Sequence, residues 1–212
     1  TKYEVLQYTS KEYYKDNYTK FLPSLYINYS PSDQHKFNYT LSYRISRPHF
    51  NSLNPFITYT SPNTYRTGNP FLKASERLSQ NFQYLLLNKY YITLSYATTN
   101  KLINSIEIIK DNNLIERKPV NLGKGKDFAI QFNTNKEYMN GKANINLNIS
   151  GNWTKVDGNS DGVDINYTNT SFSVYLNNYF QLSRKHNLSL DIGVAYYTKQ
   201  KYSNVESPSE LG

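Results

Sequence analysis

FAIQFNTNKEYMNGKANINLNI, residues 128–149, shows the structural pattern of this chain most clearly. Apolar residues recur at every second position in both halves of this stretch, at Phe128, Ile130, Phe132, Ile145, Leu147 and Ile149. Side chains of a β-strand point alternately to opposite faces, so a period of two predicts strands with one apolar and one polar face. Residues 136–141 join the two strands, which predicts an antiparallel hairpin.

The same alternation extends in both directions from this hairpin. It recurs in the segments 22–30, 37–45, 82–86, 92–96, 172–182 and 188–196. Together with the central hairpin, these segments predict eight long strands and an all-β fold, with no convincing helix. Residues 1–20 are polar and poorly defined by the pattern, and the whole chain, 1–212, is interpreted as a single domain.

The connections between these strands alternate between short and long. The short ones are residues 31–34, 88–89, 136–141 and 183–186, and the long ones are 46–78, 99–123 and 157–169. Outer-membrane barrels have this asymmetry, with short periplasmic turns and long extracellular loops. The pattern predicts an antiparallel up-and-down meander, an arc of about eight strands from a larger transmembrane β-barrel. A soluble β-sandwich that binds glycans or proteins has a similar alternation and is the alternative.

The two faces of the strands predict where lipid contacts the barrel. Apolar residues on one face would contact outer-membrane lipid, whereas their polar neighbours would face the lumen. The residues expected on a single exposed apolar surface are Phe128, Ile130, Phe132, Leu188, Ile192 and Val194.

Composition excludes several other classes of protein. No stretch approaches the roughly 18 consecutive apolar residues of a membrane helix, and the mean hydropathy is −0.72. The 22 tyrosines suit strands that have a large interfacial surface. The net charge is +8, but the 24 Lys and Arg residues are scattered and never form a block of five or six, which argues against nucleic-acid binding. The sequence begins at Thr1, and its last residues do not show the pattern of a strand that would close a barrel. We therefore expect a fragment of a longer exported protein.

The longest connection lies within residues 42–76, SYRISRPHFNSLNPFITYTSPNTYRTGNPFLKASE. It greatly exceeds the usual loop of about 4 to 6 residues, which predicts a functional role or packing against a large partner. Four prolines exclude a helical conformation at the residues before them, and Gly68 is expected to form a turn at positive φ. We therefore predict a shaped, non-helical loop.

Three motifs of this segment carry a family resemblance. YRISRP at 43–48, LNPF at 53–56 and TYRTGNPFLK at 64–73 resemble Bacteroidota outer-membrane β-barrel proteins of the TonB-dependent receptor type. The resemblance covers residues 21–197 and implies an arc of a barrel of about twenty-two strands. It also implies binding or uptake of a ligand at the cell surface, with a plug domain, a TonB-type energy transducer and a surface lipoprotein as partners of the full-length protein. It implies neither an enzyme nor a cofactor.

Candidate site residues lie mainly in the long loop. Arg44, Arg47 and Arg66 are expected to donate bidentate hydrogen bonds, either to carboxylates that anchor the loop or to a ligand. Aromatic side chains are expected to contribute contact surface at Tyr59, Tyr65 and Phe71.

A weak calcium motif occurs in the connection 157–169. Asp157, Asn159 and Asp161 follow the spacing with which a calcium-binding loop begins, but Thr168 occupies the position of the bidentate glutamate. The three histidines are far apart in the sequence, so no metal site is predicted from them. No catalytic motif is present in the sequence.

Overall fold

The computed structural model describes residues 2–7, 12–17, 20–110, 113–140, 142–160, 162–183, 186–202 and 205–211. Eight long strands form one antiparallel meander. They are β3 (Ser24–Ser32), β4 (His35–Ser46), β7 (Ser75–Leu86), β8 (Tyr90–Ile109), β9 (Ile115–Tyr138), β10 (Ala143–Ser160), β11 (Val163–Gln181) and β12 (Asn187–Tyr197). The predicted number of strands and the up-and-down topology are confirmed, and the sheet is not closed.

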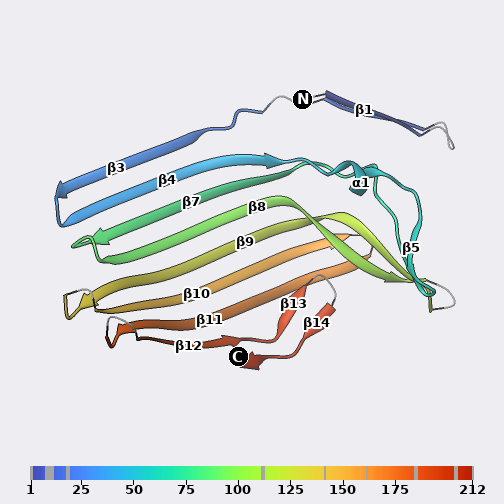
Figure 1. Ribbon diagram of the computed structural model, residues 1–212. Coiled ribbons are helices and arrows are strands. Elements are labelled where there is room, and N and C mark those ends of the chain that lie inside the picture. The colour runs from blue at the N-terminus through green and yellow to red at the C-terminus, as the bar shows by residue number, and fades with distance from the viewer. Residues whose placement is uncertain are drawn as a thin grey trace.

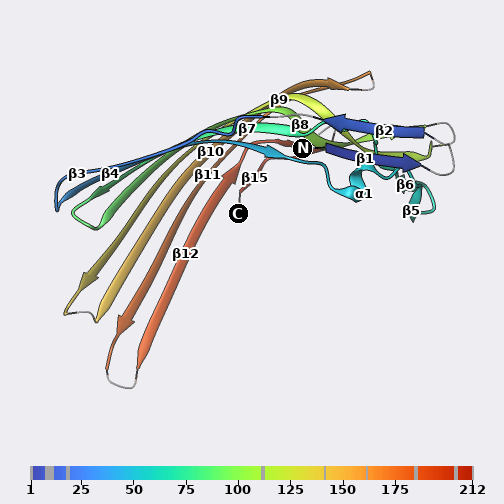
Figure 2. The ribbon, with the colours of Figure 1, turned by 90° about the horizontal axis from the view of Figure 1, so that it is seen from above.

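Shorter elements complete the chain. They are β1 (Lys2–Gln7), β2 (Glu12–Asn17), α1 (Phe50–Leu53), β5 (Thr58–Ser61), β6 (Thr64–Arg66), β13 (Gln200–Tyr202), β14 (Val205–Ser207) and β15 (Glu210–Leu211). The short turns lie together at the left-hand end of the sheet, whereas α1 and β5 lie at the opposite end (Figure 1). Seen from above, the strands diverge toward the short turns (Figure 2). No helix in the described part of the chain is long and apolar enough to cross a membrane.

Strand register aligns the apolar residues into rows across the sheet. One row of directly opposed residues crosses all eight strands: Tyr29, Phe37, Tyr84, Ile92, Phe132, Ile149, Val174 and Val194. The parallel row one residue away is polar, with Asn38, Gln83, Thr93, Gln131, Ser150 and Ser173. Every strand therefore presents its apolar residues to the same side of the sheet.

The apolar side of the sheet is uncovered within the described residues. Phe128, Ile130, Leu188, Ile192 and Val194 share this side and are between 43% and 52% exposed, and Phe132 in the same row is half-buried. The predicted apolar surface is confirmed. Apart from the large sheet, the described strands form only two two-stranded sheets, so no second large sheet packs against it as in a β-sandwich.

The predicted loop at 157–169 belongs to strands instead, whereas the projecting hairpin expected at 99–123 is present with a longer return arm. Residues 157–169 continue β10 and β11, which pair until Ser160 lies opposite Val163. Turn-forming Asp, Asn and Gly residues dominate positions 157–164, and they favour a loop over the short alternation of Val163, Ile165 and Tyr167. Pro119 and Gly123 favour an end to the return arm of this hairpin, but β9 continues through both. Pro119 is tolerated because β9 pairs with β10 only up to Lys124, so residue 119 needs no backbone N–H for a ladder bond to β10.

A small core lies at the end of the sheet where β8 to β11 project beyond the apolar band. Ile106, Val120, Leu122, Val156 and Ile165 are 0% to 2% exposed and pack together. Val156 is in phase with Ser150 of β10, and Ile165 is in phase with Ser173 of β11. Both therefore belong to the polar side of the sheet. This rim core fixes the projecting β8–β9 hairpin over the polar side.

Candidate functional site

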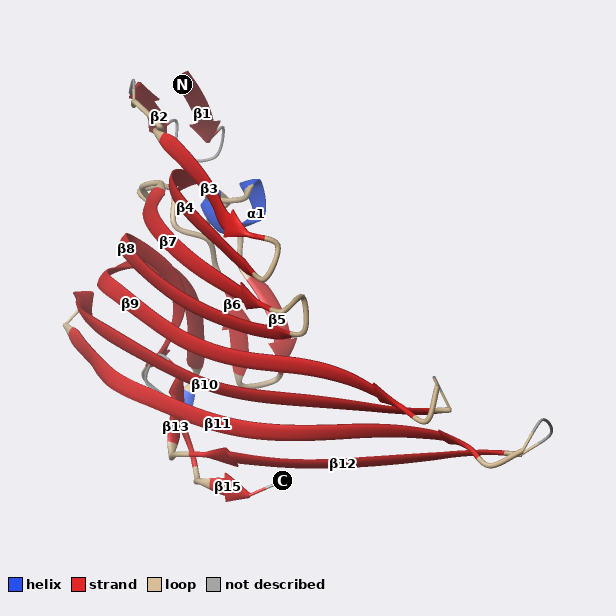
Figure 3. Cartoon of the chain, turned by 90° about the vertical axis from the view of Figure 1, so that its left-hand side faces the viewer, coloured by secondary structure: helices blue, strands red, loops and turns tan. Residues whose placement is uncertain are grey.

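The long loop crosses the polar side of the sheet and attaches to β9. Its residues are 47–74, a few fewer than the predicted 46–78, because β4 and β7 extend further. β6 pairs in parallel with β9, and the Thr67 amide donates to the carbonyl of Arg117 at 3.1 Å. Figure 3 shows α1, β5 and β6 on the concave side of the sheet. The loop thus covers an edge of β9 that β10 does not reach.

Asparagine side chains hold the loop in place. Asn121 of β9 accepts a hydrogen bond from the Lys73 amide at 2.7 Å and donates to the Lys73 carbonyl at 2.8 Å. It also donates to the carbonyl of Lys101 at 3.0 Å, and Asn69 donates to the carbonyl of Pro119 at 3.2 Å. The loop is therefore anchored to β9 through two asparagine side chains, and Asn121 also ties this anchor to β8.

Gly68 is required by close packing and not by a positive φ. Positive φ among the described glycines occurs at Gly162, so that part of the prediction is wrong. The Gly68 amide donates to the Asn54 carbonyl at 2.9 Å, and a Cβ at Gly68 would lie 2.2 Å from that oxygen. The prediction of no helix is also wrong at α1, where the Asn54 amide donates to the Phe50 carbonyl.

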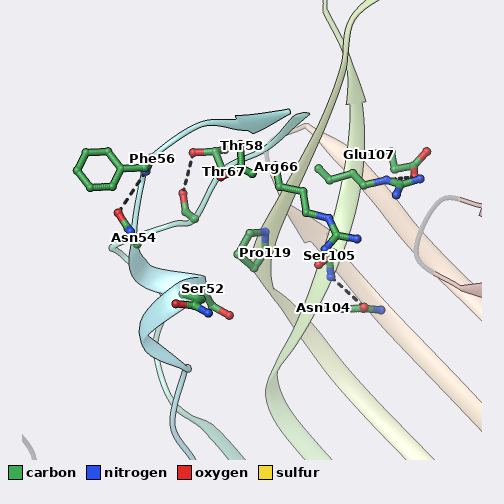
Figure 4. Close-up of a pocket in the computed structure, with 13 residues that line it drawn as sticks. Ser52, Asn54, Phe56, Thr58, Arg66, Thr67, Asn104, Ser105, Glu107 and Pro119 are labelled. Carbon is green, nitrogen blue, oxygen red and sulfur yellow. Dashed lines mark hydrogen bonds and ion pairs between the residues drawn. The ribbon is translucent and has the colours of Figure 1, made fainter. Parts of the chain in front are cut away.

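A pocket of about 870 Å³, with both polar and apolar lining, lies between the loop and the β8–β9 hairpin. Figure 4 shows α1 and the following chain on one side and the hairpin on the other, with the Arg66 side chain directed toward Ser105 and Pro119. Amide and hydroxyl side chains line the pocket at Asn51, Ser52, Asn54, Thr58, Thr67, Asn104 and Ser105, although apolar atoms contribute the larger share of its surface. Phe56 and Pro119 contribute apolar surface. Such a lining suits a polar ligand.

This pocket is called here the rim pocket. Its charged lining residues are Arg66, Arg117 and Glu107. Arg117 Nε donates to Glu107 Oε1 at 2.8 Å, which leaves that pair neutral overall. Arg66 lies opposite Arg117 in the β6–β9 register and is exposed, and within the described residues its guanidinium has no hydrogen-bond or ion-pair partner. The pocket therefore carries one uncompensated positive charge.

The other predicted site residues are dispersed. Arg47 lines a neighbouring pocket of about 370 Å³ together with His49 and Arg77. Tyr59 and Tyr65 pack against each other with ring centroids 5.8 Å apart. Neither of these tyrosines lines the rim pocket.

Arg44 and Phe71 line neither pocket. Arg44 is exposed on the polar side opposite Arg77, and Phe71 is 71% exposed. Of the six predicted contact residues, the structure brings only Arg47 and Arg66 to a described pocket.

Sequence reasoning missed the charged residues of the strands. Arg77 donates to Asp127 at 2.7 Å and to Thr99 at 2.9 Å, across two strand interfaces that no sequence spacing reveals. Glu107 and Arg117 could have been found, because they are equidistant from the hairpin turn near residue 112 and are therefore directly opposed.

The calcium candidates lie at the tip of β10. Asp157 forms an ion pair with Lys155 at 3.3 Å, and Asn159 donates to Asp164 across the β10–β11 pair. Asp161 lies outside the described residues. Asp157 and Asn159 therefore belong to a strand and not to a loop, and within the described residues no group of three potential metal ligands is present.

Solved structures similar to this chain include two of the ferric enterobactin receptor PfeA. One is its complex with BCV-L6, with 12% identity and a TM-score of 0.47 over 87% of this chain and 36% of the receptor. The other is a mutant from Pseudomonas aeruginosa, with 12% identity and a TM-score of 0.45 over 90% and 39%. The chain thus spans less than half the length of either receptor, and no curated protein matches it.

A family model described as an outer membrane protein β-barrel family matches residues 1–210. The match agrees with the single antiparallel meander and its uncovered apolar side, and it excludes the soluble β-sandwich. This chain belongs to the outer membrane protein β-barrel family, and its location is the outer membrane of a Gram-negative bacterium.

Proposed function

We propose that the chain is part of the wall of a receptor-like barrel that binds a ligand at the cell surface and takes part in its uptake. The observation that carries this proposal is the rim pocket, in which the Arg66 guanidinium is exposed and lacks a partner among the described residues. A guanidinium presents a fork of donors that suits a carboxylate or phosphate. The expected ligand is therefore polar and carries an anionic group.

The open sheet supports a larger barrel. Among the described strands, β3 pairs only with β4, and β12 pairs beyond β11 only with β15, at Tyr196 and Tyr197. Unpaired backbone groups in hydrocarbon cost several kcal/mol each, so strands within a membrane must pair along both edges. We infer that further strands of the full-length protein close the barrel. A plug domain and a TonB-type transducer would then be its partners in uptake.

Substitution of Arg66 tests the proposal in the full-length protein. Probes are acidic oligogalacturonides and acidic peptides, each compared with its neutral counterpart for binding to the purified protein. Acidic probes should raise the thermal midpoint of the unsubstituted protein, R66Q should weaken this binding at least about tenfold, and R66K should weaken it less. R44Q is the matched control, because Arg44 is an exposed arginine of the polar side that lines neither described pocket.

The same variants separate ligand contact from anchoring of the loop. Because the anchors are Asn69 and Asn121, R66Q without ligand should unfold at the temperature of the unsubstituted protein. Equal loss of thermal stability and of probe binding in R66Q would assign Arg66 to anchoring. Acidic probes that bind R66Q and the unsubstituted protein equally would contradict the proposed site.

A further inference from the structure

Three lysines extend the apolar side of the sheet beyond its hydrophobic band. Lys124 and Lys126 of β9 occupy alternate positions in phase with Phe128 and Ile130, so they project from the same side. Lys155 of β10 lies directly opposite Lys126. The three residues, called here the lysine patch, are thus on the lipid-facing side and not in the lumen.

Aromatic residues mark the boundary between the hydrophobic band and the lysine patch. Tyr96, Phe128 and Trp153 form one row of directly opposed residues across β8, β9 and β10. Aromatic girdles of this kind lie at the membrane–water interface of outer-membrane barrels. Lys126 and Lys124 precede Phe128 by two and four residues, which is about 7 Å and about 14 Å along the strand. The patch therefore lies at the depth of the lipid headgroups.

Protein carboxylates balance the charges of the lysine patch only in part, because Asp157, directly opposite Lys124, is shared among three lysines. Like charges directly opposed across two strands, as at Lys126 and Lys155, are destabilising. Lys155 pairs with Asp157 at 3.3 Å, whereas Lys124 and Lys126 are exposed and have no ion-pair partner among the described residues. Three lysines against one aspartate leave two positive charges for an external anion.

Other lysines on this side differ from the patch in this respect. Lys20 and Lys101 both bind Glu76, at 3.1 Å and 3.5 Å, and Glu76 also accepts a hydrogen bond from Tyr43. These two lysines share a protein carboxylate, so their charge is already partly compensated. The uncompensated charge on the apolar side is concentrated at β9 and β10.

We propose that the lysine patch binds the phosphate groups of anionic lipid in the outer leaflet. The aliphatic stems of the lysines would lie along the apolar band while their ammonium groups reach the phosphates. Each lysine near an anionic membrane surface strengthens association by about fivefold. This contact holds the barrel wall at a defined depth, and it is independent of the rim pocket on the opposite side of the sheet.

The test uses the full-length protein in detergent, with bisphosphorylated lipid A as the probe and retained lipid counted by native mass spectrometry. K124Q/K126Q should retain lipid A at least about tenfold more weakly than the unsubstituted protein, and K124R/K126R should retain it normally. The matched control is K89Q/K142Q, which removes two exposed lysines from turns at the opposite end of the sheet and should have no effect.

Two results would overturn the proposal. The first is equal retention of lipid A by K124Q/K126Q and the unsubstituted protein. The second is equal retention of dephosphorylated lipid A and of the phosphorylated form by the unsubstituted protein, because the lysine patch would then not be recognising phosphate. Heat-dependent migration on gels verifies that each variant is folded before its retention is compared.

Discussion

Single residues of the loop act through the space and the hydrogen bonds that they provide. At Gly68 a Cβ would approach the Asn54 carbonyl oxygen to 2.2 Å, so the backbone must move before any side chain can be accommodated. In the same turn, the Thr67 amide donates a hydrogen bond to Arg117 of β9, and the Asn69 side chain donates one to the carbonyl of Pro119. A shift at Gly68 therefore reaches both anchors of the loop and the adjoining pocket.

Gly68→Ala should destabilise the loop by about 1 to 3 kcal/mol, the usual cost of forcing extra volume into a packed site. The expected result is faster tryptic cleavage after Arg66 and Lys73 in the full-length protein, together with weaker probe binding. Gly125→Ala is the control, because its Cβ would lie 3.4 Å from the nearest atom, in the Leu102 side chain. Equal cleavage rates for G68A and G125A would show that the loop does not depend on this close contact.

At this scale the sequence predicted the residue types better than their roles. Arg66 was identified and lines the pocket, but the loop is held by Asn69 and Asn121, whose residue type is too common in this chain to be conspicuous. The proline restrictions predicted a shaped loop without predicting its partner strand. Contacts between residues about 50 positions apart depend on strand register, which no local pattern specifies.

The sequence predicted the strands best. It did so in those parts of each strand that have one face toward lipid and the other toward water. There the difference between the faces is large, and the period of two is unbroken from Leu188 to Tyr196. Where β10 and β11 extend beyond the apolar band, Asp, Asn and Gly residues at 157–164 resemble a turn, although Ile165 packs in the rim core. The strand ends were missed for that reason.

Ile192→Arg tests the lipid-facing side of β12. Ile192 lies midway between Leu188 and Tyr196 and opposite Leu176, so it should occupy the middle of the bilayer. Arginine at the midplane costs about 2 to 4 kcal/mol, measured as the unfolding free energy of the full-length protein in lipid vesicles.

Ser189→Arg is the matched control, because Ser189 lies on the same strand with its side chain on the polar side. It should change the unfolding free energy little. A larger cost for S189R than for I192R would assign the two sides of the sheet in reverse.

The whole molecule is a curved wall with two unlike ends. Short turns occupy one end, whereas the other carries the long loop, the rim core and the pocket (Figure 1). In outer-membrane barrels the short turns are periplasmic, so we expect the pocket at the cell surface. The resemblance in the loop motifs and the alternation of connection lengths together predicted this arrangement, although neither indicated how the loop packs.

Labelling of single cysteines on intact cells tests this orientation most directly. Asn63 lies exposed in the β5–β6 turn and Asp33 lies exposed in the turn between β3 and β4, so the two positions mark opposite ends of the wall. With an impermeant thiol reagent, N63C in the full-length protein should label on intact cells, whereas D33C should label only after the outer membrane is permeabilised. Labelling of D33C but not of N63C on intact cells would place the pocket in the periplasm and contradict a role in binding ligands at the cell surface.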